Sequence, residues 1–598
     1  MTEIKKPIIN YTGRDFASIK KQLVDYSQKY YPDTFKDFNE ASFGSLMLDM
    51  VAYVGDIMSF YTDYQANESF METAIEFQNV LKGSKQLGYK YKPNASSFGT
   101  VSFFVTIPSL GTSVSPDYSY APILKKGSTF ASTSDILFTL VEDIDFGTTS
   151  EDVVVASSSE DGSTPTTFAL KAKGTVISGE LFTETFIVEN YKQFLKLEIF
   201  DENLTEIIEV YDSDGNNYYE VDYLSQDVVY VPVLNTATTK EYAKNILKPI
   251  SVPRRFVVDH GVLATTLQFG YGTEDNEEKI IDPTKVILDL FGKDYITDKS
   301  FDPTVLTKSS KLGIVPSDTI ITVIYRRNTV LDVNVPSGFL TGKVNPLMKF
   351  LNENTLENAQ VTQTLNSLEL VNESSITGFA APMTSEELKL RARGAYGAQN
   401  RAVTKDDYIS LCYNMPSNFG QIKKAALVRD ETSFNGKNLN LYVISVDGID
   451  LFTSTNTIIK QNLRTWINKY KMIGDTIDIL DAHVINLQID FTAVGFANIN
   501  KYETLNDCLS TLSNYYETYS YDIGEPFKIS DVYKLLNSIS SVVDTKSVQV
   551  TPKFGTNYSA YGVTYESLVS SDGRYLIPPE NAVFEIKFTT EDINGEII

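Results

Sequence analysis

The chain has 598 residues, a formal net charge of −25, two histidines and two cysteines, but 36 tyrosines and 34 phenylalanines. This scarcity argues against a disulfide scaffold, for which Cys412 and Cys508 are the only possible pair, and against a zinc site. The acidic charge argues against nucleic-acid binding. We also expect neither a signal peptide nor a membrane-spanning helix, because no long uncharged apolar run occurs. At roughly 150 residues per domain, the length predicts about four domains.

The first ninety residues carry apolar residues at helical spacing. Thr12 and Asp15 resemble a capping box, and the helix that follows is expected to end at Pro32. A second helix is predicted over residues 41–64. A third is predicted over residues 68–87, where Gly88 can cap it in the left-handed conformation.

The second predicted helix carries two regular patterns. Its apolar residues are spaced alternately by four and three, which forms the a/d seam typical of a helix packed lengthwise against another helix. The seam fits either packing within its own domain or docking onto helices of a partner chain, and about three heptads do not decide between them. An acidic stripe with one aspartate every seven residues runs beside the seam and argues against a membrane. The seam residues are Leu46, Met50, Tyr53, Ile57, Phe60 and Tyr64, and the stripe residues are Asp49, Asp56 and Asp63.

From Phe98 onward the apolar period changes to two, which predicts strands separated by turns. Residues 212–217 have the oxygen-rich composition of a calcium loop. Gly215, however, falls at the fourth position instead of the sixth, so we expect a turn without metal. The glycines in residues 270–272 precede an acidic loop and no helix, which argues against a phosphate-binding loop. The expected strands are Val101–Ile107, Phe186–Val188, Phe194–Phe200, Ile207–Tyr211, Tyr218–Val221, Val228–Val233 and Ile320–Tyr325.

Helical character returns near Thr384, and Thr404 is predicted to cap another helix that has acidic residues in its first turn. Residues 374–430 hold eight Lys or Arg against five Asp or Glu, a local charge of +3 in a chain of −25. Such a basic region fits docking to an acidic neighbour, including another copy of the chain. It equally fits a solvated pair of helices.

Strand and helix patterns continue to the C-terminus and suggest a compact α+β arrangement. We therefore predict an α+β multidomain fold with a helical N-terminal region, a β-rich middle and α/β C-terminal domains. The predicted domains are residues 1–95, 96–365, 366–480 and 481–598. The expected elements are strands over Leu439–Val446, Val484–Val494 and Val548–Val550, and helices over Thr455–Tyr470, Leu505–Tyr519 and Ile529–Ile539.

No recognised catalytic motif occurs in the sequence. A Ser–His–Asp triad would need His260 or His483, and Asp259 would point away from its strand neighbour His260. Cys412 lies on an apolar helix face, as a small core residue does. A pair of carboxylates could support hydrolysis, but nothing among 77 acidic residues selects a pair. We expect no enzyme activity, no cofactor and no metal.

Several stretches carry a resemblance that spans nearly the whole chain. The chain resembles the baseplate wedge protein of T4-like contractile-tailed phages, within the baseplate J-like family. The helical start matches in YTGRDF and EASFGSLMLDMVAYVGDIMSFYTDYQANESFMETA, the central strand motif in PRRFVVDHGVLATTLQFGYG, and the J-like signature in SSITGFAAPMTSEELKLRARGAYGAQNRAVTKDDY. Two late stretches also fit: GEPFKISDVYKLLNSISSVVDTKSVQV and LIPPENAVFEIKF. The sequence departs from the family at residues 541–544, which lack the usual glycine of a turn.

The resemblance implies a structural part of the virion tail baseplate that is assembled in the host cytoplasm. Its N-terminal helices would join helices of a larger wedge protein through the seam. Its C-terminal domains would self-associate as dimers into a ring around the hub, which holds the sheath initiator, contacts other wedge proteins and widens on contraction. The basic region matches the J-like signature, and we infer ring contacts at Arg391, Arg393, Arg401 and Lys405.

Two other functions stay open at this stage. A tail-associated cell-wall hydrolase is suggested only by the abundant acidic residues. A host-binding or carbohydrate-binding tail protein is suggested by the tyrosine-rich β middle. No membrane or nucleic-acid partner is expected.

Overall fold

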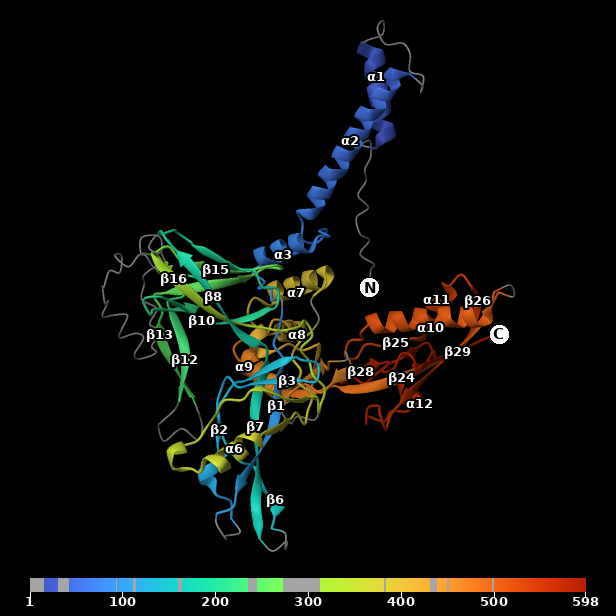
Figure 1. Cartoon of the computed structure of the whole chain (residues 1–598). Helices are drawn as coiled ribbons and strands as arrows, with labels where there is room; N and C mark the ends of the chain where they lie inside the picture. Colours follow the sequence, from blue (N-terminus) through green and yellow to red (C-terminus); the bar gives the residue numbers. More distant parts are fainter. Residues whose placement is uncertain are drawn as a thin grey trace. The chain divides into compact units, whose positions relative to one another are not determined.

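The computed structural model describes residues 15–30, 42–92, 94–110, 115–159, 164–234, 245–272, 312–380, 383–430, 438–448, 451–496 and 499–598. The chain divides into two units. The helical unit comprises Met1–Lys90 with Met383–Tyr396, and the large unit comprises Tyr91–Pro382 with Gly397–Ile598. The predicted α+β multidomain class is confirmed, with helices first, a β-rich middle and mixed elements at the C-terminal end (Figure 1). The finer division into four domains stays a prediction.

The helical unit holds two long packed helices and two shorter ones. Ser42 caps the second helix by accepting a hydrogen bond from the backbone N–H of Ser45. The third predicted helix was placed wrongly, because the chain turns over residues 69–76 before it begins. Gly88 adopts a φ of +85°, as expected for a helix end. The capping box at Thr12 and the end at Pro32 lie outside the described residues. The helices are α1 (Phe16–Tyr30), α2 (Phe43–Glu68), α3 (Phe77–Gln86) and α7 (Ser385–Ala398, all but its last two residues in this unit).

The first sheet of the large unit has the order β17-β3-β4-β7-β1-β19, and β6 pairs with the edge of β7 that faces away from β1. The predicted alternation in β1 is confirmed: Val101, Phe103, Val105 and Ile107 are all fully buried. These residues form one core with side chains of the neighbouring strands. The strands are β1 (Phe98–Pro108), β3 (Thr129–Ser132), β4 (Leu137–Leu140), β6 (Asp152–Ser158), β7 (Pro165–Ser178), β17 (Leu340–Asn345) and β19 (Glu369–Val371).

A second seven-stranded sheet follows in the order β8-β16-β10-β11-β14-β15-β9 and carries its own core. Residues 212–217 form the turn between β10 and β11, where Asp212 Oδ1 accepts hydrogen bonds from the backbone N–H groups of Asp214 and Asn216. The expected turn is confirmed. The strands are β8 (Glu180–Val188), β9 (Lys196–Ile199), β10 (Leu204–Asp212), β11 (Asn217–Glu220), β14 (Arg255–His260), β15 (Thr265–Phe269) and β16 (Thr319–Arg327).

Smaller elements complete the β-rich middle. Two strands form a separate hairpin, three short strands form a small sheet, and a helix and two 3-10 turns lie beside the first sheet. They are β12 (Val228–Leu234), β13 (Asn245–Ser251), β2 (Ile123–Leu124), β5 (Ile144–Asp145), β18 (Met348–Lys349), α6 (Asn358–Asn366), η1 (Tyr118–Tyr120) and η4 (Glu353–Thr355).

Two mixed arrangements of helices and sheets make up the C-terminal half. In the first, helices pack on the sheet β20-β21-β22 with β23. In the second, α10 and α11 pack on a sheet whose central strand β24 pairs with β26, β28 and β29. The first holds α8 (Lys405–Tyr413), η5 (Ser417–Phe419), α9 (Thr457–Ile467), β20 (Lys424–Arg429), β21 (Asn438–Val446), β22 (Phe452–Thr453) and β23 (Thr476–Asp481). The second holds α10 (Lys501–Thr518), α11 (Ile529–Asn537), α12 (Tyr565–Leu568), β24 (His483–Gly495), β25 (Phe527–Lys528), β26 (Val542–Lys553), β27 (Tyr575–Leu576), β28 (Ala582–Glu585) and β29 (Ile593–Ile597).

Candidate assembly surfaces

The face of α2 that packs against α1 is made of small residues. Ser45 and Ala52 are buried, and a Cβ atom added at Gly55 would lie 3.3 Å from Cδ1 of Ile19 on α1. Small side chains let two helices approach closely. Lys20 of α1 also forms an ion pair of 2.7 Å with Asp49 of α2. The contact between α1 and α2 therefore uses a face that the seam does not occupy.

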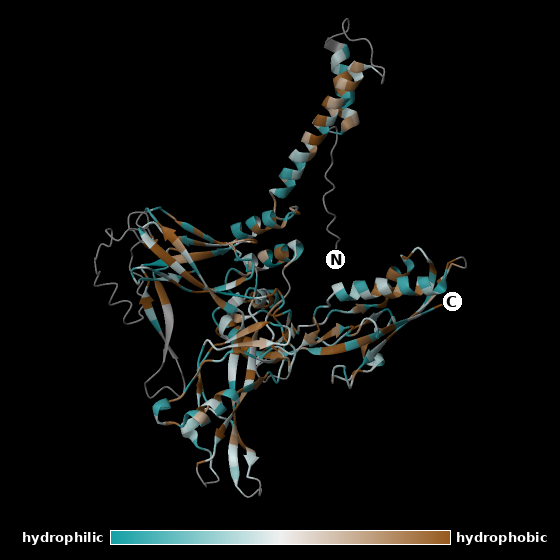
Figure 2. Ribbon diagram, viewed as in Figure 1, coloured by the Kyte–Doolittle hydropathy of each residue, from teal (hydrophilic) through white to brown (hydrophobic). Residues whose placement is uncertain are grey.

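The seam of α2 is largely exposed to solvent. Leu46, Met50, Tyr53 and Phe60 are each more than half exposed. The other two seam residues are half-buried, as are the three aspartates of the stripe. Further large apolar residues beside the seam are exposed as well, and Figure 2 shows how hydrophobic this helix is. We call the exposed set the apolar band, which consists of Leu46, Met47, Met50, Val51, Tyr53, Val54, Met58, Phe60 and Tyr61.

The size and shape of the apolar band are those of an interaction surface. Monomeric proteins seldom leave a contiguous apolar patch of more than a few hundred Å² open to water. The band runs along one helix, as the a/d residues of a coiled-coil helix do before its partner arrives. The exposure of the seam favours docking onto a partner chain over packing within its own domain.

By length and composition, α2 is also long and apolar enough to cross a membrane, and it is the one helix in the described part of the chain that meets this test. The same test is met by helices that pack inside soluble proteins. Each 18-residue window of α2 contains at least two acidic residues, because Asp49, Asp56 and Asp63 are seven residues apart. In the most apolar 18-residue segment of α2, only 11% is buried.

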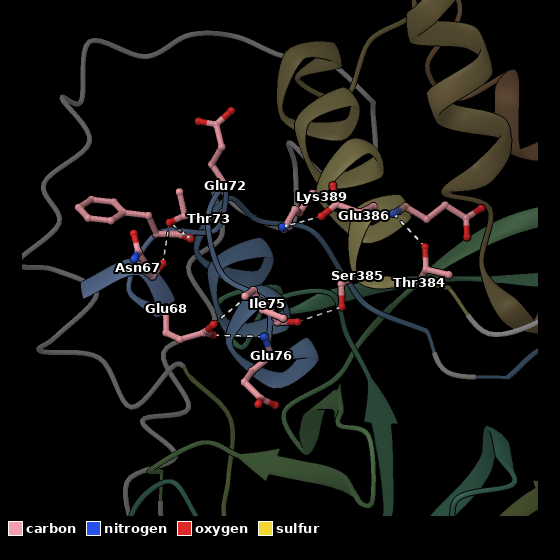
Figure 3. A network of polar contacts seen from close by, with 12 residues as sticks. Asn67, Glu68, Glu72, Thr73, Ile75, Glu76, Thr384, Ser385, Glu386 and Lys389 are labelled. Carbon is pink, nitrogen blue, oxygen red and sulfur yellow. Dashed lines mark hydrogen bonds and ion pairs between the residues drawn. The ribbon is translucent and has the colours of Figure 1, made fainter. Parts of the chain in front are cut away.

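The C-terminal end of α2 is held by a network of hydrogen bonds (Figure 3). The carboxylate of Glu68 accepts bonds from the backbone N–H of Ile75 at 2.8 Å and of Glu76 at 3.3 Å, and from Asn79 Nδ2 at 2.9 Å. Asn79 first, and then the backbone of Ile75, hold the pKa of Glu68 below its usual value. Ser385 Oγ at the start of α7 reaches the carbonyl of Ile75. The turn between α2 and α3 is thereby tied to α7.

Two of the predicted ring contacts lie on α7 and already have partners. Arg391 binds Glu387 one turn earlier at 3.0 Å, and Arg393 binds Glu72 in the turn after α2 at 2.7 Å. Thr384 accepts a hydrogen bond from the backbone N–H of Glu387, which confirms the predicted helix start. Arg393 therefore links α7 to the turn after α2, whereas the ion pair of Arg391 lies within α7.

The other two predicted ring contacts lie in the large unit, at the start of α8. Thr404 caps this helix in a capping box with Asp407, which confirms the predicted cap. Burial acts to raise the pKa of Asp407, but hydrogen bonds from the backbone of Thr404 and Val403, together with the charge of Arg401, lower it overall. Arg401 and Lys405 are exposed. The four candidate residues are thus divided between two units.

The described residues contain no group of three or more His, Cys, Asp or Glu side chains that could hold a metal ion. His260 Nδ1 lies 3.2 Å from the hydroxyl of Thr265, and His483 stacks on Tyr561 with the ring centres 4.3 Å apart. Burial raises the pKa of Cys412 to about 12, so its thiol is not a ready nucleophile. The prediction that Cys412 is a core residue is confirmed.

Sequence reasoning missed two carboxyl groups near the C-terminus, one fully buried and one half-buried. Asp592 is fully buried and accepts from Lys553 Nζ at 2.8 Å and from Tyr558 at 2.7 Å. Glu585 accepts from the backbone N–H of Phe452 and from Asn486, and burial raises its pKa to about 7. No motif marks either residue, because each contacts chain that is more than thirty positions away.

Residues 15–84 match the family model described as bacteriophage baseplate protein, N-terminal domain. This stretch is similar to a phage baseplate domain. It contains α1, α2 and most of α3, so the apolar band lies within the matched region. The match supports a structural component of a phage tail baseplate.

The other comparisons add little. No curated protein matches the chain. Among solved structures, a chain in the cryo-EM structure of the anti-feeding prophage (AFP) baseplate, 6-fold symmetrised, aligns with 9% identity over 96% of this chain and 99% of that chain. Its TM-score is 0.28, which is too low to support an argument about fold or function.

Proposed function

We propose that the chain is a wedge protein of a contractile-tail baseplate, of the T4-like and baseplate J-like kind, without enzyme activity. The observation that carries this proposal is the apolar band on α2, which lies inside the stretch similar to a phage baseplate domain. It is assembled in the host cytoplasm and acts in the virion tail.

In this proposal the apolar band docks onto helices of a larger wedge protein. The seam has the four-three spacing of coiled-coil packing, and its side chains are free to enter holes between facing residues. The acidic stripe beside it would help to set the register against basic residues of the partner, with Asp49 also paired to Lys20 of α1. The network around Glu68 fixes the C-terminal end of α2. The helix can therefore keep a defined angle to α3 and α7.

We further propose that the large unit self-associates into a ring around the hub, contacts the sheath initiator and other wedge proteins, and rearranges on sheath contraction. Arg401 and Lys405 are the favoured ring contacts, because both are exposed. Arg391 and Arg393 could contribute only by exchanging Glu387 and Glu72 for acidic residues of a neighbour. Contacts of that kind would break and reform at little cost, since exposed ion pairs contribute about 0.2–1 kcal/mol.

Substitution in the seam tests the docking step. The double variant Met50→Asp, Ile57→Asp should abolish co-assembly with the neighbouring wedge proteins when both are expressed together, because two carboxylates would be buried without partners. The control is Ile75→Asp, since Ile75 is 73% exposed but lies in the turn after α2. The circular dichroism of both variants should match that of the unaltered chain. Co-assembly that survives the double variant would contradict the proposal.

The two alternative functions predict different results. A cell-wall hydrolase would clear peptidoglycan in a zymogram of the purified chain, and clearing that disappears on mutating one carboxylate would overturn the proposal. A host-binding protein would lie at the periphery of the tail. An antibody label on this chain should instead appear close to the hub in electron micrographs.

A further inference from the structure

The chain passes from the first mixed arrangement to the second through a single residue. β23 ends at Asp481 and β24 begins at His483, so Ala482 alone lies between the two strands. The backbone N–H of Ala482 donates to the carbonyl of Val443 on β21 at 3.0 Å. The next N–H, that of His483, donates to the carbonyl of Asn581 beside β28 at 2.9 Å. Consecutive peptide groups are thus bonded to different sheets, and the φ and ψ angles of Ala482 join them.

The residues on both sides of Ala482 are anchored. The carboxylate of Asp481 accepts a hydrogen bond from the backbone N–H of Thr455 at 3.0 Å and forms an ion pair of 2.6 Å with Lys460. On the other side, His483 is already part of the parallel pairing between β24 and β28. Hinges are a few residues at the ends of elements, often small, that absorb changes in φ and ψ. Ala482 has this position and this size.

The two mixed arrangements share little of their cores. Phe98 of β1 and Ile177 of β7 belong to the core of the first arrangement, which joins it to the β-rich middle. The first arrangement gives Ile444 of β21 to the core of the second, with Tyr442 and Phe452 packed beside it. Among the described elements, no helix or strand of one arrangement packs extensively against one of the other. A small junction of this kind leaves relative motion as the default expectation.

Two polar contacts cross the junction. The backbone N–H of Phe452 on β22 donates to Glu585 Oε1 on β28 at 2.7 Å. Lys424 Nζ on β20 forms an ion pair of 2.6 Å with Asp522 and donates to the carbonyl of Ser520 at 3.3 Å. The side chain of Asp522 is 69% exposed, and an ion pair with so exposed a partner contributes little to stability. Both contacts can therefore open without unfolding either sheet.

We propose that Ala482 is a hinge, about which residues 483–598 turn as one body against the rest of the large unit when the contacts of Lys424 and Glu585 open. Such a turn gives a physical route for the rearrangement on sheath contraction, and in that use it rests on the proposed function. The hinge itself is a property of the free chain, so it can be tested there separately.

The distance between two spin labels, measured by double electron–electron resonance, tests the hinge. Gln461→Cys on α9 and Asn506→Cys on α10 place one label on each side of the junction. The control pair is Asn506→Cys with Gln549→Cys on β26, because both positions lie in the second arrangement. All three positions are exposed, and the two native cysteines are buried. Dilution with unlabelled chain restricts the measurement to distances within one chain.

The double variant Lys424→Ala, Glu585→Ala should broaden the distance distribution across the junction about twofold and leave that of the control pair unchanged. Lys424→Ala alone should broaden it less, and it leaves the core of the second arrangement untouched. The conservative variant Lys424→Arg, Glu585→Gln keeps a donor and an acceptor at these positions. Its distribution should therefore be as narrow as that of the unaltered chain.

Three results would overturn the hinge. The first is a distribution across the junction that stays as narrow in the double alanine variant as in the unaltered chain. The second is equal broadening of the control pair, because the second arrangement would then have loosened internally. The third is equal broadening in the conservative variant, which would show that the two contacts do not hold the junction. None of these results affects the docking of α2, whose own test is co-assembly of the seam variant.

Discussion

The helix α2 and the strand β24 are both long and apolar, yet their apolar residues have opposite fates. In β24 the inward residues Ile485, Leu487, Ile489, Phe491 and Ala493 are all buried at 3% exposure or less. They pack with α10 and α11 in the largest core of the C-terminal half. In α2 every residue of the apolar band is exposed. One element completes its core within the chain, and the other leaves its apolar surface open to solvent.

The core around β24 and the apolar band therefore differ in what their apolar residues stabilise. Burial of apolar surface stabilises the fold by roughly 25 cal/mol per Å². The core around β24 gains this stabilisation on folding, whereas the apolar band can gain it only on assembly. The same substitution should therefore have a large effect on unfolding near β24 and almost none in the apolar band.

The largest expected effect is that of Phe584→Ala in the C-terminal half. Phe584 is fully buried with its ring 6.4 Å from those of Phe527 and Tyr521. Truncating it should lower the free energy of unfolding of the large unit by about 3–5 kcal/mol. Urea unfolding followed by tyrosine fluorescence measures this change. A loss below about 1 kcal/mol would mean that the core around β24 is not close-packed.

Lys553→Ala should cost slightly less, about 3 kcal/mol, because it leaves the fully buried Asp592 without its ammonium partner. Tyr558 and the backbone N–H of Phe588 would still donate to that carboxylate. The control is Lys125→Ala, whose partner Asp143 is largely exposed, and which should not change unfolding measurably. Equal effects of the two lysine substitutions would contradict the buried ion pair.

A smaller effect is expected from pH at Glu585, which faces Lys587 and Asp447. Its pKa in the folded chain, about 7, lies above the ordinary value of 4.5, so the folded state retains the proton that the unfolded state has lost. Stability should therefore fall as pH rises from about 4.5 to about 7, by about 2 kcal/mol after allowance for solvent near this half-buried residue. In Glu585→Gln this part of the pH dependence should vanish. If Glu585→Gln has the same pH dependence of stability as the unaltered chain, the carboxyl of Glu585 is hydrated and does not cause that dependence.

The smallest effect is expected from Phe60→Ala in the apolar band. Phe60 is 56% exposed, so this truncation should change the unfolding of the free chain by less than about 0.5 kcal/mol. The same variant should weaken co-assembly with wedge proteins, because the seam would lose an aromatic side chain. A cost similar to that of Phe584→Ala in the free chain would erase the contrast between α2 and β24.

Helices and strands were predicted correctly where neighbouring residues determine them. Period-two alternation placed β1, and Thr404 placed the start of α8, because side-chain period and helix caps are set by neighbouring residues. The break after α2 was not found, since residues 69–76 contain neither glycine nor proline. That turn depends on hydrogen bonds that the Glu68 carboxylate accepts from backbone N–H groups seven and eight positions away.

The candidate surfaces were harder to predict than the elements. A four-three seam has the same sequence pattern whether it is buried or exposed, so only the structure separates the seam from the small-residue face that meets α1. The charge count suggested one basic region, but Arg391 and Arg393 are held by Glu387 and Glu72, which the count does not reveal. The strand β6 was missed, although three consecutive valines signal it.

The most direct test of the docking claim is the labelling of a single cysteine in the apolar band. In Met50→Cys, position 50 should react rapidly with a maleimide in the free chain, because Met50 is 56% exposed and the native cysteines are buried. In assembled baseplates the same thiol should be protected about a hundredfold, as expected for a side chain buried between helices. Equal labelling in the free chain and in the baseplate would contradict the account.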